Sequence, residues 1–276
     1  MKRLFFFTAA FLFTLSVINA QTSDVDGITK ACTDYVLGSL AADGNLLTES
    51  VHPEFNKAKV EYLPQIKRSF LRKSRLSELY AIANSKAYFT PEDQRNIDVQ
   101  VLDVDENIAC AMVKSSKFLD YCQLIKDGDS WKLVNVLWNY NPDNKPPQAK
   151  EEEGELSEKM IFGAGMDYID GAYSGNAERM ERALHPELNK VFPYKISNSE
   201  NTFLPITGYQ SLIEMTRAGI MNLPEGERKI EKKLLAADGN MAFIKMASAK
   251  YIDYCQIGLV NGEAKIINVL WRPNRD

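Results

Sequence analysis

The chain has 276 residues, of which 45% are hydrophobic and 25% are charged, and its formal net charge is −4. This composition is typical of globular proteins and excludes a disordered, collagen-like or strongly basic chain, so we expect no nucleic-acid partner. Single hydrophobic cores stop growing at about 250 to 300 residues, and the length therefore predicts one or two domains.

The first twenty residues have the layout of a secretory signal peptide. The basic pair Lys2-Arg3 precedes an apolar stretch at 4–17, and Ala20 supplies a small residue for cleavage. We expect residues 1–20 to be removed and the mature chain to be periplasmic or secreted. Gln21 follows the predicted cut, so the lipid-anchored form of such a signal lacks its cysteine acceptor. No later segment has the roughly 18 to 20 uninterrupted apolar residues of a membrane span.

The chain contains an internal repeat, because residues 28–143 align without a gap with residues 161–276. The repeated clusters are Asp34-Tyr35 with Asp167-Tyr168, His52-Pro53-Glu54 with His185-Pro186-Glu187, Asp120-Tyr121-Cys122-Gln123 with Asp253-Tyr254-Cys255-Gln256, and Asn135-Val136-Leu137-Trp138 with Asn268-Val269-Leu270-Trp271. Solenoid repeats run about 20 to 50 residues, so a period of this length indicates a duplicated domain.

We predict that repeat 1 occupies residues 21–143 and repeat 2 residues 159–276, with a linker at 144–158. The linker contains Pro146-Pro147 and the run Glu151-Glu152-Glu153-Gly154-Glu155. Charge and proline with almost no apolar residue cannot form a core, which favours a solvated connection.

Each repeat begins with three predicted helices. They are recognised by apolar residues spaced three or four apart or by turn residues at their ends. The second helix closes before a His-Pro pair, because the residue before proline is driven out of the helical conformation. The short pairs Asp43-Gly44 and Ser174-Gly175 are predicted to end the first helix. The predicted helices lie at 28–40, 46–51 and 74–84 in repeat 1 and at 161–173, 177–184 and 209–218 in repeat 2.

The second part of each repeat consists of short β-rich runs separated by turn residues. In repeat 1 the predicted strands lie at 97–104, 108–114, 118–125 and 131–138. Helices first and an antiparallel meander afterwards predict an α+β domain in which three helices pack on one face of a curved antiparallel sheet.

Four motifs of repeat 1 occur in an order and spacing that repeat 2 largely repeats. They are Tyr35 in the first helix, His52-Pro53-Glu54 after the second, Asp120-Tyr121 in the penultimate strand and the run from Trp131 to Asn135; Ala264 stands at the place of Trp131 in repeat 2. On these motifs each repeat resembles the nuclear-transport-factor-2-like superfamily, and most closely its branch named "putative lumazine-binding". The resemblance covers nearly all of the mature chain and implies two cone-shaped α+β domains, each with a pocket between helices and sheet.

The resemblance implies either a binding module or an enzyme, because relatives include isomerases and cyclases. A ketosteroid-isomerase mechanism needs an Asp base in an apolar cavity. Alignment through Tyr35 places Lys59 and Phe192 at the base position, and neither can act as a carboxylate base. We therefore favour an exported, non-catalytic protein that binds a small organic ligand in an apolar pocket of each repeat, with no cofactor. The alternatives are an isomerase, dehydratase or cyclase-type enzyme that uses the histidines, and a protein-interaction scaffold with vestigial pockets.

Eight residues in equivalent places are predicted to lie near the two cavity mouths and to bind the ligand. The histidines are acid-base candidates or turn residues, the aspartates need a partner within a strand, and the tyrosines lie on the apolar stripe of a helix. One histidine per repeat falls short of the three or four ligands of zinc, so no metal site is expected. The predicted ligand-binding residues are Tyr35, His52, Asp120, Trp138, Tyr168, His185, Asp253 and Trp271.

Two further expectations concern packing. The two sheets are predicted to pack on each other as an intramolecular pseudo-dimer, and one repeat is expected to bind better because Trp131 and Val99 correspond to Ala264 and Lys232.

Four cysteines remain after the predicted leader. Reflection of the hairpin about Ser116 places Cys110 opposite Cys122, a candidate disulfide, whereas Phe243 replaces Cys110 in repeat 2 and Cys255 therefore has no local partner. Buried free thiols are the alternative for all four, Cys32 included.

Overall fold

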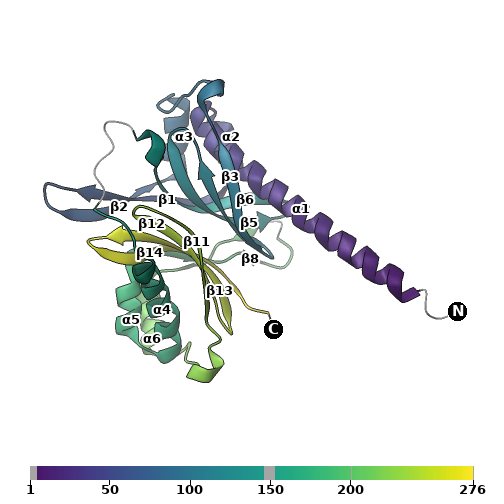
Figure 1. Cartoon of the computed structure of the whole chain (residues 1–276), viewed down its shortest axis with the longest axis vertical. Coiled ribbons are helices and arrows are strands. Elements are labelled where there is room, and N and C mark those ends of the chain that lie inside the picture. Colours follow the sequence, from purple (N-terminus) through teal and green to yellow (C-terminus); the bar gives the residue numbers. More distant parts are fainter. Residues whose placement is uncertain (1–4, 146–152, 200, 276) are drawn as a thin grey trace.

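The computed structural model describes residues 5–145, 153–199 and 201–275, with side chains described from residue 22 onward. Each repeat folds into helices and a six-stranded sheet, and the two sheets lie between the two sets of helices (Figure 1). The elements of repeat 1 are α1 (Phe5–Leu40), α2 (Gly44–Ser50), β1 (Val51–Leu63), β2 (Arg68–Ser74), α3 (Leu76–Asn84), η1 (Glu92–Gln94), β3 (Asp98–Asp105), β4 (Ile108–Lys114), β5 (Phe118–Asp127), β6 (Ser130–Tyr140) and η2 (Pro142–Asn144).

Repeat 2 has a similar order of elements, but three short strands stand where repeat 1 has the single strand β2. They are α4 (Glu158–Ser174), α5 (Ala177–Ala183), β7 (Leu184–Val191), β8 (Tyr194–Lys195), β9 (Thr202–Phe203), β10 (Ile206–Thr207), α6 (Tyr209–Arg217), η3 (Glu225–Glu227), β11 (Glu231–Asp238), β12 (Met241–Ala247), β13 (Tyr251–Val260) and β14 (Glu263–Pro273).

Helix α1 begins at Phe5, within the predicted leader, and continues without a break through the first helix of repeat 1. Its N-terminal half extends away from the rest of the molecule, whereas its C-terminal half lies on the sheet (Figure 1). Within the described part of the chain, no helix combines the length and apolarity that crossing a membrane requires.

The predicted α+β class is confirmed, and all six helices and the four-stranded meander lie close to the predicted positions. Gly175 ends α4 in the left-handed conformation, with a φ of 67°, which glycine adopts without steric cost. Asp43 instead begins the next helix, because its side chain caps α2 by accepting a hydrogen bond from the Leu46 amide at 3.0 Å.

The prediction that all helices precede the sheet is wrong. Residues 51–74 form β1 and β2, and β1 joins the meander by pairing in parallel with β6. The His52-Pro53 pair lies inside β1 rather than in a turn, where the pairing with β6 shifts register between Val51 and Asn56. A proline is tolerated at such an irregular place because the missing N–H leaves no regular ladder bond unmade.

The two sheets meet face to face through one apolar cluster that draws residues from both repeats, among them Tyr121 and Tyr254. Gln123 and Gln256, both fully buried, make equivalent reciprocal hydrogen bonds across this contact. The Gln123 amide donates to the Tyr254 carbonyl and the Gln256 amide to the Tyr121 carbonyl, each at 2.7 Å. These contacts fit the expected pairing of the two repeats.

The contact between the sheets is asymmetric at its edge. Lys245 of repeat 2 donates to Asp103 at 2.7 Å and to Asp105 at 2.9 Å, and Arg272 also binds Asp105. At the equivalent positions of repeat 1, Met112 and Asn139 replace these two cations. Repeat 1 therefore lacks the two cations of this network at these positions.

The predicted opposition of Cys110 and Cys122 is wrong. Cys110 pairs with Gln123 and Cys122 with Ala111, because the hairpin turns at Ser116-Lys117 and the register is one residue from the predicted one. A shift of one residue sends the two side chains to opposite faces of the sheet. Cys110 lies between the sheets and Cys122 faces the helices. All four thiols are free and buried.

Candidate functional site

Three polar side chains from three elements meet inside repeat 1. Tyr35 comes from α1, Lys57 from β1 and Asp120 from β5. The Lys57 ammonium donates to the Tyr35 hydroxyl oxygen at 2.5 Å and to Asp120 Oδ1 at 3.0 Å. The Tyr35 hydroxyl lies 3.4 Å from the same carboxylate oxygen. We call Tyr35, Lys57 and Asp120 triad 1.

Repeat 2 contains the equivalent group, Tyr168, Lys190 and Asp253, which we call triad 2. Lys190 donates to the Tyr168 hydroxyl oxygen at 2.5 Å and to Asp253 Oδ1 at 2.8 Å. The Tyr168 hydroxyl donates to Asp253 Oδ1 at 2.7 Å, a closer contact than its counterpart in triad 1. Duplication has thus preserved a buried ion pair together with a phenol.

Each triad is almost shielded from water. The lysine side chains are 10% exposed and the aspartate side chains 1% exposed. Burial raises the pKa of Asp120, although the Lys57 ammonium opposes the shift. Burial and the neighbouring carboxylate raise the pKa of both Tyr35 and Tyr168 well above the usual value of a phenol, so both remain protonated donors.

The predicted tryptophans complete the two groups. The lysine ammonium lies 4.8 Å from the ring centre of Trp138 in repeat 1 and of Trp271 in repeat 2. This distance is within the range of a cation–π attraction. Six of the eight predicted site residues are therefore gathered in two equivalent clusters, and their ligand-binding role stays a prediction.

Sequence reasoning missed the lysine at the centre of each cluster. Lys57 and Lys190 are identical in the repeat alignment and stand in a segment for which no strand was predicted. A lysine retained in both copies beside apolar residues was the available signal, but its aspartate partner lies 63 residues further along the chain.

Triad 2 lies at a cavity of about 130 Å³ between α4, α6 and the sheet of repeat 2. Lys190 is the only charged side chain among the residues that line it. The wall includes three methionines and several aromatic rings, and the Tyr251 and Trp271 rings meet edge to face with centres 5.3 Å apart. Aliphatic members of the wall are Ile169, Ala172, Met180, Leu212, Met215, Ile220 and Met221.

The equivalent cavity of repeat 1 is only about 60 Å³. Lys57, Glu61 and Arg72 line it, and Arg72 forms an ion pair with Glu61 at 3.5 Å. The Lys59 ammonium lies 4.4 Å from the ring centre of Tyr140, which is one of the lining residues. The expectation of an apolar pocket in each repeat therefore holds for repeat 2, whereas charged side chains line the pocket of repeat 1.

A difference in strand length explains why Glu61 and Arg72 reach the cavity of repeat 1 whereas repeat 2 has no such pair among its described lining residues. β1 continues to Leu63 and places Glu61 over the cavity of repeat 1, where β2 adds Arg72. β7 ends at Val191, and Pro193 follows, which has no backbone N–H for the ladder.

The two histidines do not line either cavity. The His52 ring contacts the Thr202 carbonyl of repeat 2 at 3.0 Å and accepts the Glu54 amide at 3.1 Å. His185 accepts the Glu187 amide in the same way. The structure thus separates both histidines from the tyrosine, aspartate and tryptophan with which they were grouped, because the start of β1 or β7 lies away from the triad.

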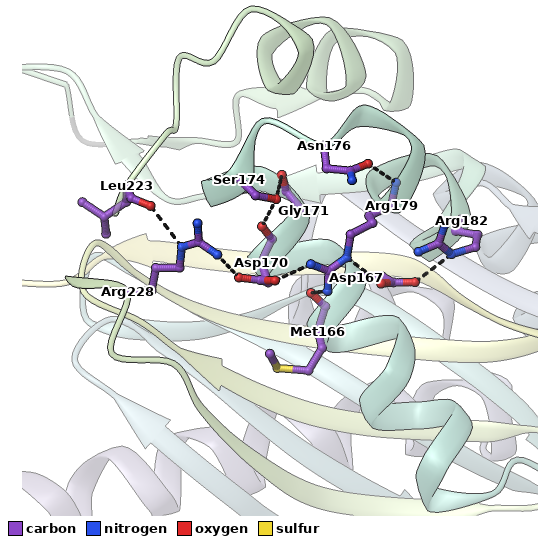
Figure 2. A network of polar contacts seen from close by, with 10 residues as sticks. All are labelled: Met166, Asp167, Asp170, Gly171, Ser174, Asn176, Arg179, Arg182, Leu223 and Arg228. Carbon is purple, nitrogen blue, oxygen red and sulfur yellow. Dashed lines mark hydrogen bonds and ion pairs between the residues drawn. The ribbon is translucent and has the colours of Figure 1, made fainter. Parts of the chain in front are cut away.

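A charged network holds the wall of the repeat 2 cavity (Figure 2). Asp170 on α4 lies between Arg179 of α5 and Arg228, and Arg228 also donates to the Leu223 carbonyl at 3.0 Å. Although burial opposes the shift, hydrogen bonds from the two arginines lower the pKa of Asp170. The network fixes the segment after α6, which carries Ile220 and Met221 into the cavity wall.

Repeat 1 lacks this network, because Leu37 and Leu46 stand at the places of Asp170 and Arg179. Asp167 extends the network in repeat 2 by binding Arg179 and Arg182, each at 2.9 Å. The two repeats therefore share the triads and differ in both the lining and the support of the cavity.

The family described as "Putative lumazine-binding" matches residues 23–139 and 157–272. Among solved structures, an NTF2-like protein of unknown function from Shewanella baltica is 16% identical, with a TM-score of 0.37, and the match covers 44% of this chain and 96% of that one. An NTF2-like protein from Methylobacillus flagellatus, also of unknown function, is 22% identical, with a TM-score of 0.33, over 42% of this chain and 91% of that one.

A third similar structure is an NTF2-like protein with a cystatin-like fold from Novosphingobium aromaticivorans, 13% identical, with a TM-score of 0.35, over 50% of this chain and 92% of that one. The comparison with curated proteins found no match.

Proposed function

Because the chain belongs to the family described as "Putative lumazine-binding", we propose that it is a non-catalytic protein that binds a small organic molecule in the cavity of repeat 2. The observation that carries the proposal is the cavity of about 130 Å³, which is lined mainly by aliphatic and aromatic side chains, with Lys190 as the one charged residue of its described lining. Pockets that bind small molecules are typically apolar, with a few placed polar groups that fix orientation.

We assign repeat 1 a supporting role. Its cavity is about half as large and already contains an ion pair between Arg72 and Glu61, so little apolar surface remains for a ligand. Its sheet instead packs against the sheet of repeat 2, which supports the pseudo-dimer as the state in which the binding repeat is stable.

The enzymatic alternative that uses the histidines receives no support from the cavity walls. His52 and His185 lie outside both walls, and the phenols of the triads remain protonated and bound to a carboxylate. A proton-transfer mechanism needs a group whose pKa lies near the operating pH within reach of the substrate.

We further propose that the chain is exported and that residues 1–20 are removed. The basic pair, the apolar stretch and the small residue at position 20 support this, as does the extension of the N-terminal half of α1 beyond the folded body (Figure 1). N-terminal sequencing of protein from the cells that produce it should begin at Gln21. An intact Met1 would contradict the proposal.

The binding proposal is tested by native mass spectrometry of protein purified from its own cells, followed by calorimetric titration with lumazine and with any retained molecule. We expect a 1:1 complex that Met215→Trp abolishes by filling the cavity. The matched variant Ile82→Trp fills the equivalent place in repeat 1 and should leave binding unchanged. Binding that survives Met215→Trp and is lost in Ile82→Trp would move the site to repeat 1.

A further inference from the structure

We infer that the cavity of repeat 2 takes a neutral, ring-shaped ligand that carries a hydrogen-bond acceptor directed at Lys190. The inference rests on the proposed function and names the chemical class that the cavity selects. Three features carry it: the volume of the cavity, the unused donor on Lys190 and the charge balance of triad 2.

The volume favours a single ring. An engineered protein cavity of about 150 Å³ lined by aliphatic and aromatic side chains binds benzene. The cavity of repeat 2 has about 130 Å³, which suits a six-membered ring with a small substituent. Rings of Tyr251 and Trp271 form part of its wall, and three methionine side chains in that wall supply polarisable surface for contact with an aromatic ligand.

Lys190 provides the polar contact. An ammonium carries three N–H donors, and within the described residues Lys190 gives one to Tyr168 and one to Asp253. The third N–H points to neither of these partners. Lys190 itself lines the cavity, and its ammonium lies 4.8 Å from the centre of the Trp271 ring. A carbonyl or ring-nitrogen acceptor on the ligand would receive this hydrogen.

The charge balance selects a neutral molecule. The Lys190 charge is already paired with the Asp253 carboxylate at 2.8 Å, and among the described residues that line the cavity no other side chain is charged. An anionic ligand would leave one buried negative charge in excess, and a cationic ligand one positive charge. Burying an uncompensated charge is far more costly than leaving it in water.

The test uses four probes of nearly the same shape: acetophenone, isopropylbenzene, benzoate and benzamidinium. Binding to the full chain is measured by calorimetry. The quantity compared between variants is the association constant of acetophenone divided by that of isopropylbenzene. We expect this ratio to fall about tenfold when the pair Lys190→Met and Asp253→Leu removes the donor, because a hydrogen bond from a charged donor is lost. The matched pair Lys57→Met and Asp120→Leu should leave the ratio unchanged.

Benzoate and benzamidinium should bind at least tenfold more weakly than acetophenone. If benzoate bound most tightly of the four probes, the ligand would not be selected as a neutral molecule. If the repeat 2 variant left the ratio unchanged, Lys190 would not donate a hydrogen bond to the ligand. Either result leaves small-molecule binding itself standing. Failure of all four probes and of lumazine to bind would instead contradict the proposed function.

A second measurement avoids any variant that fails to fold. The carbonyl infrared band of acetophenone bound to the unmodified chain should lie at lower wavenumber than in hexane, because an N–H donor weakens the carbonyl bond. A band at the hexane position shows a carbonyl without a donor and overturns the inference.

Discussion

The two repeats share a buried centre but differ in what surrounds it. Both place a tyrosine, a lysine, an aspartate and a tryptophan in equivalent positions. Around this centre, repeat 1 has a small cavity lined by charged side chains, whereas repeat 2 has an apolar cavity whose wall is held by the network around Asp170. The comparison separates the buried centre, which both copies kept, from the lining and support of the cavity, in which the two copies differ.

The largest effect should come from breaking a triad. Lys190→Met leaves the Asp253 carboxylate buried without its cation, and we expect a loss of about 3 to 5 kcal/mol in the free energy of unfolding. Lys57→Met should cost at least as much, because Tyr35 lies 3.4 Å from Asp120 whereas Tyr168 lies 2.7 Å from Asp253. Urea unfolding of each variant measures both values.

The control for both variants also removes the aspartate. Lys190→Met combined with Asp253→Leu takes away both charges and should recover most of the lost stability. If the single and double variants were equally unstable, the lysine would act by packing alone.

A smaller effect is expected at the asymmetric edge between the repeats. Asp105→Ala removes the acceptor shared by Lys245 and Arg272 and should cost about 1.5 to 3 kcal/mol. The exposed Asp98, at the start of the same strand, provides the control variant Asp98→Ala, for which no measurable cost is expected. Equal effects of the two substitutions would mean that the network contributes nothing to the contact between the repeats.

The same network has a defined pH dependence. Although burial opposes the shift, hydrogen bonds from Lys245 and Arg272 lower the pKa of Asp105 in the folded chain. Its contribution is therefore present above the unfolded-state pKa of about 3.9 and is lost as the pH falls through the folded-state pKa. The Asp105→Ala variant should show a weaker loss of stability below about pH 4 than the unmodified chain.

The difference between the cavities can be tested by exchanging one residue. Met221 lines the cavity of repeat 2 where Tyr88 lines that of repeat 1. Met221→Tyr should weaken binding of a retained ligand at least tenfold by filling space, with little change in melting temperature. Tyr88→Met should leave affinity unchanged. An equal loss in both variants, measured by calorimetry, would contradict the assignment of the site to repeat 2.

The smallest effects are expected at the histidines. His52→Ala loses a hydrogen bond to the Thr202 carbonyl across the repeats and should cost about 1 kcal/mol, more than His185→Ala. Neither substitution should change ligand affinity, because neither side chain lines a cavity. Weakened binding at unchanged melting temperature would restore the histidines to the site.

The His185→Ala variant also has a pH signature. Burial lowers the pKa of His185, so the folded chain favours the uncharged ring and loses stability as the pH falls below the unfolded-state value of about 6.5. The variant should show a flatter dependence of stability on pH below about pH 6.5, a change that differential scanning calorimetry can follow.

Much of the fold could be predicted from the sequence because it depends on local patterns. The duplication, the six helices and the meander strands follow from identity at a fixed spacing and from apolar periodicity. Because successive side chains of a strand face opposite sides of a sheet, Asp120 and Tyr121 could also be assigned to opposite faces. Asp120 faces the helices and Tyr121 lies between the sheets. Each of these features is determined by residues close together in the chain.

Only the tertiary structure decided how distant segments meet. β1 and β7 were missed because each pairs in parallel with the last strand of its repeat, and no turn signal in the sequence marks such a pairing. The lysines of the triads lie on these strands, so their aspartate partners could not be recognised from spacing. The unequal cavities arise in the same way. The volume of a cavity depends on side chains from several elements at once, and the charge pairs that line it form only when those elements are packed together.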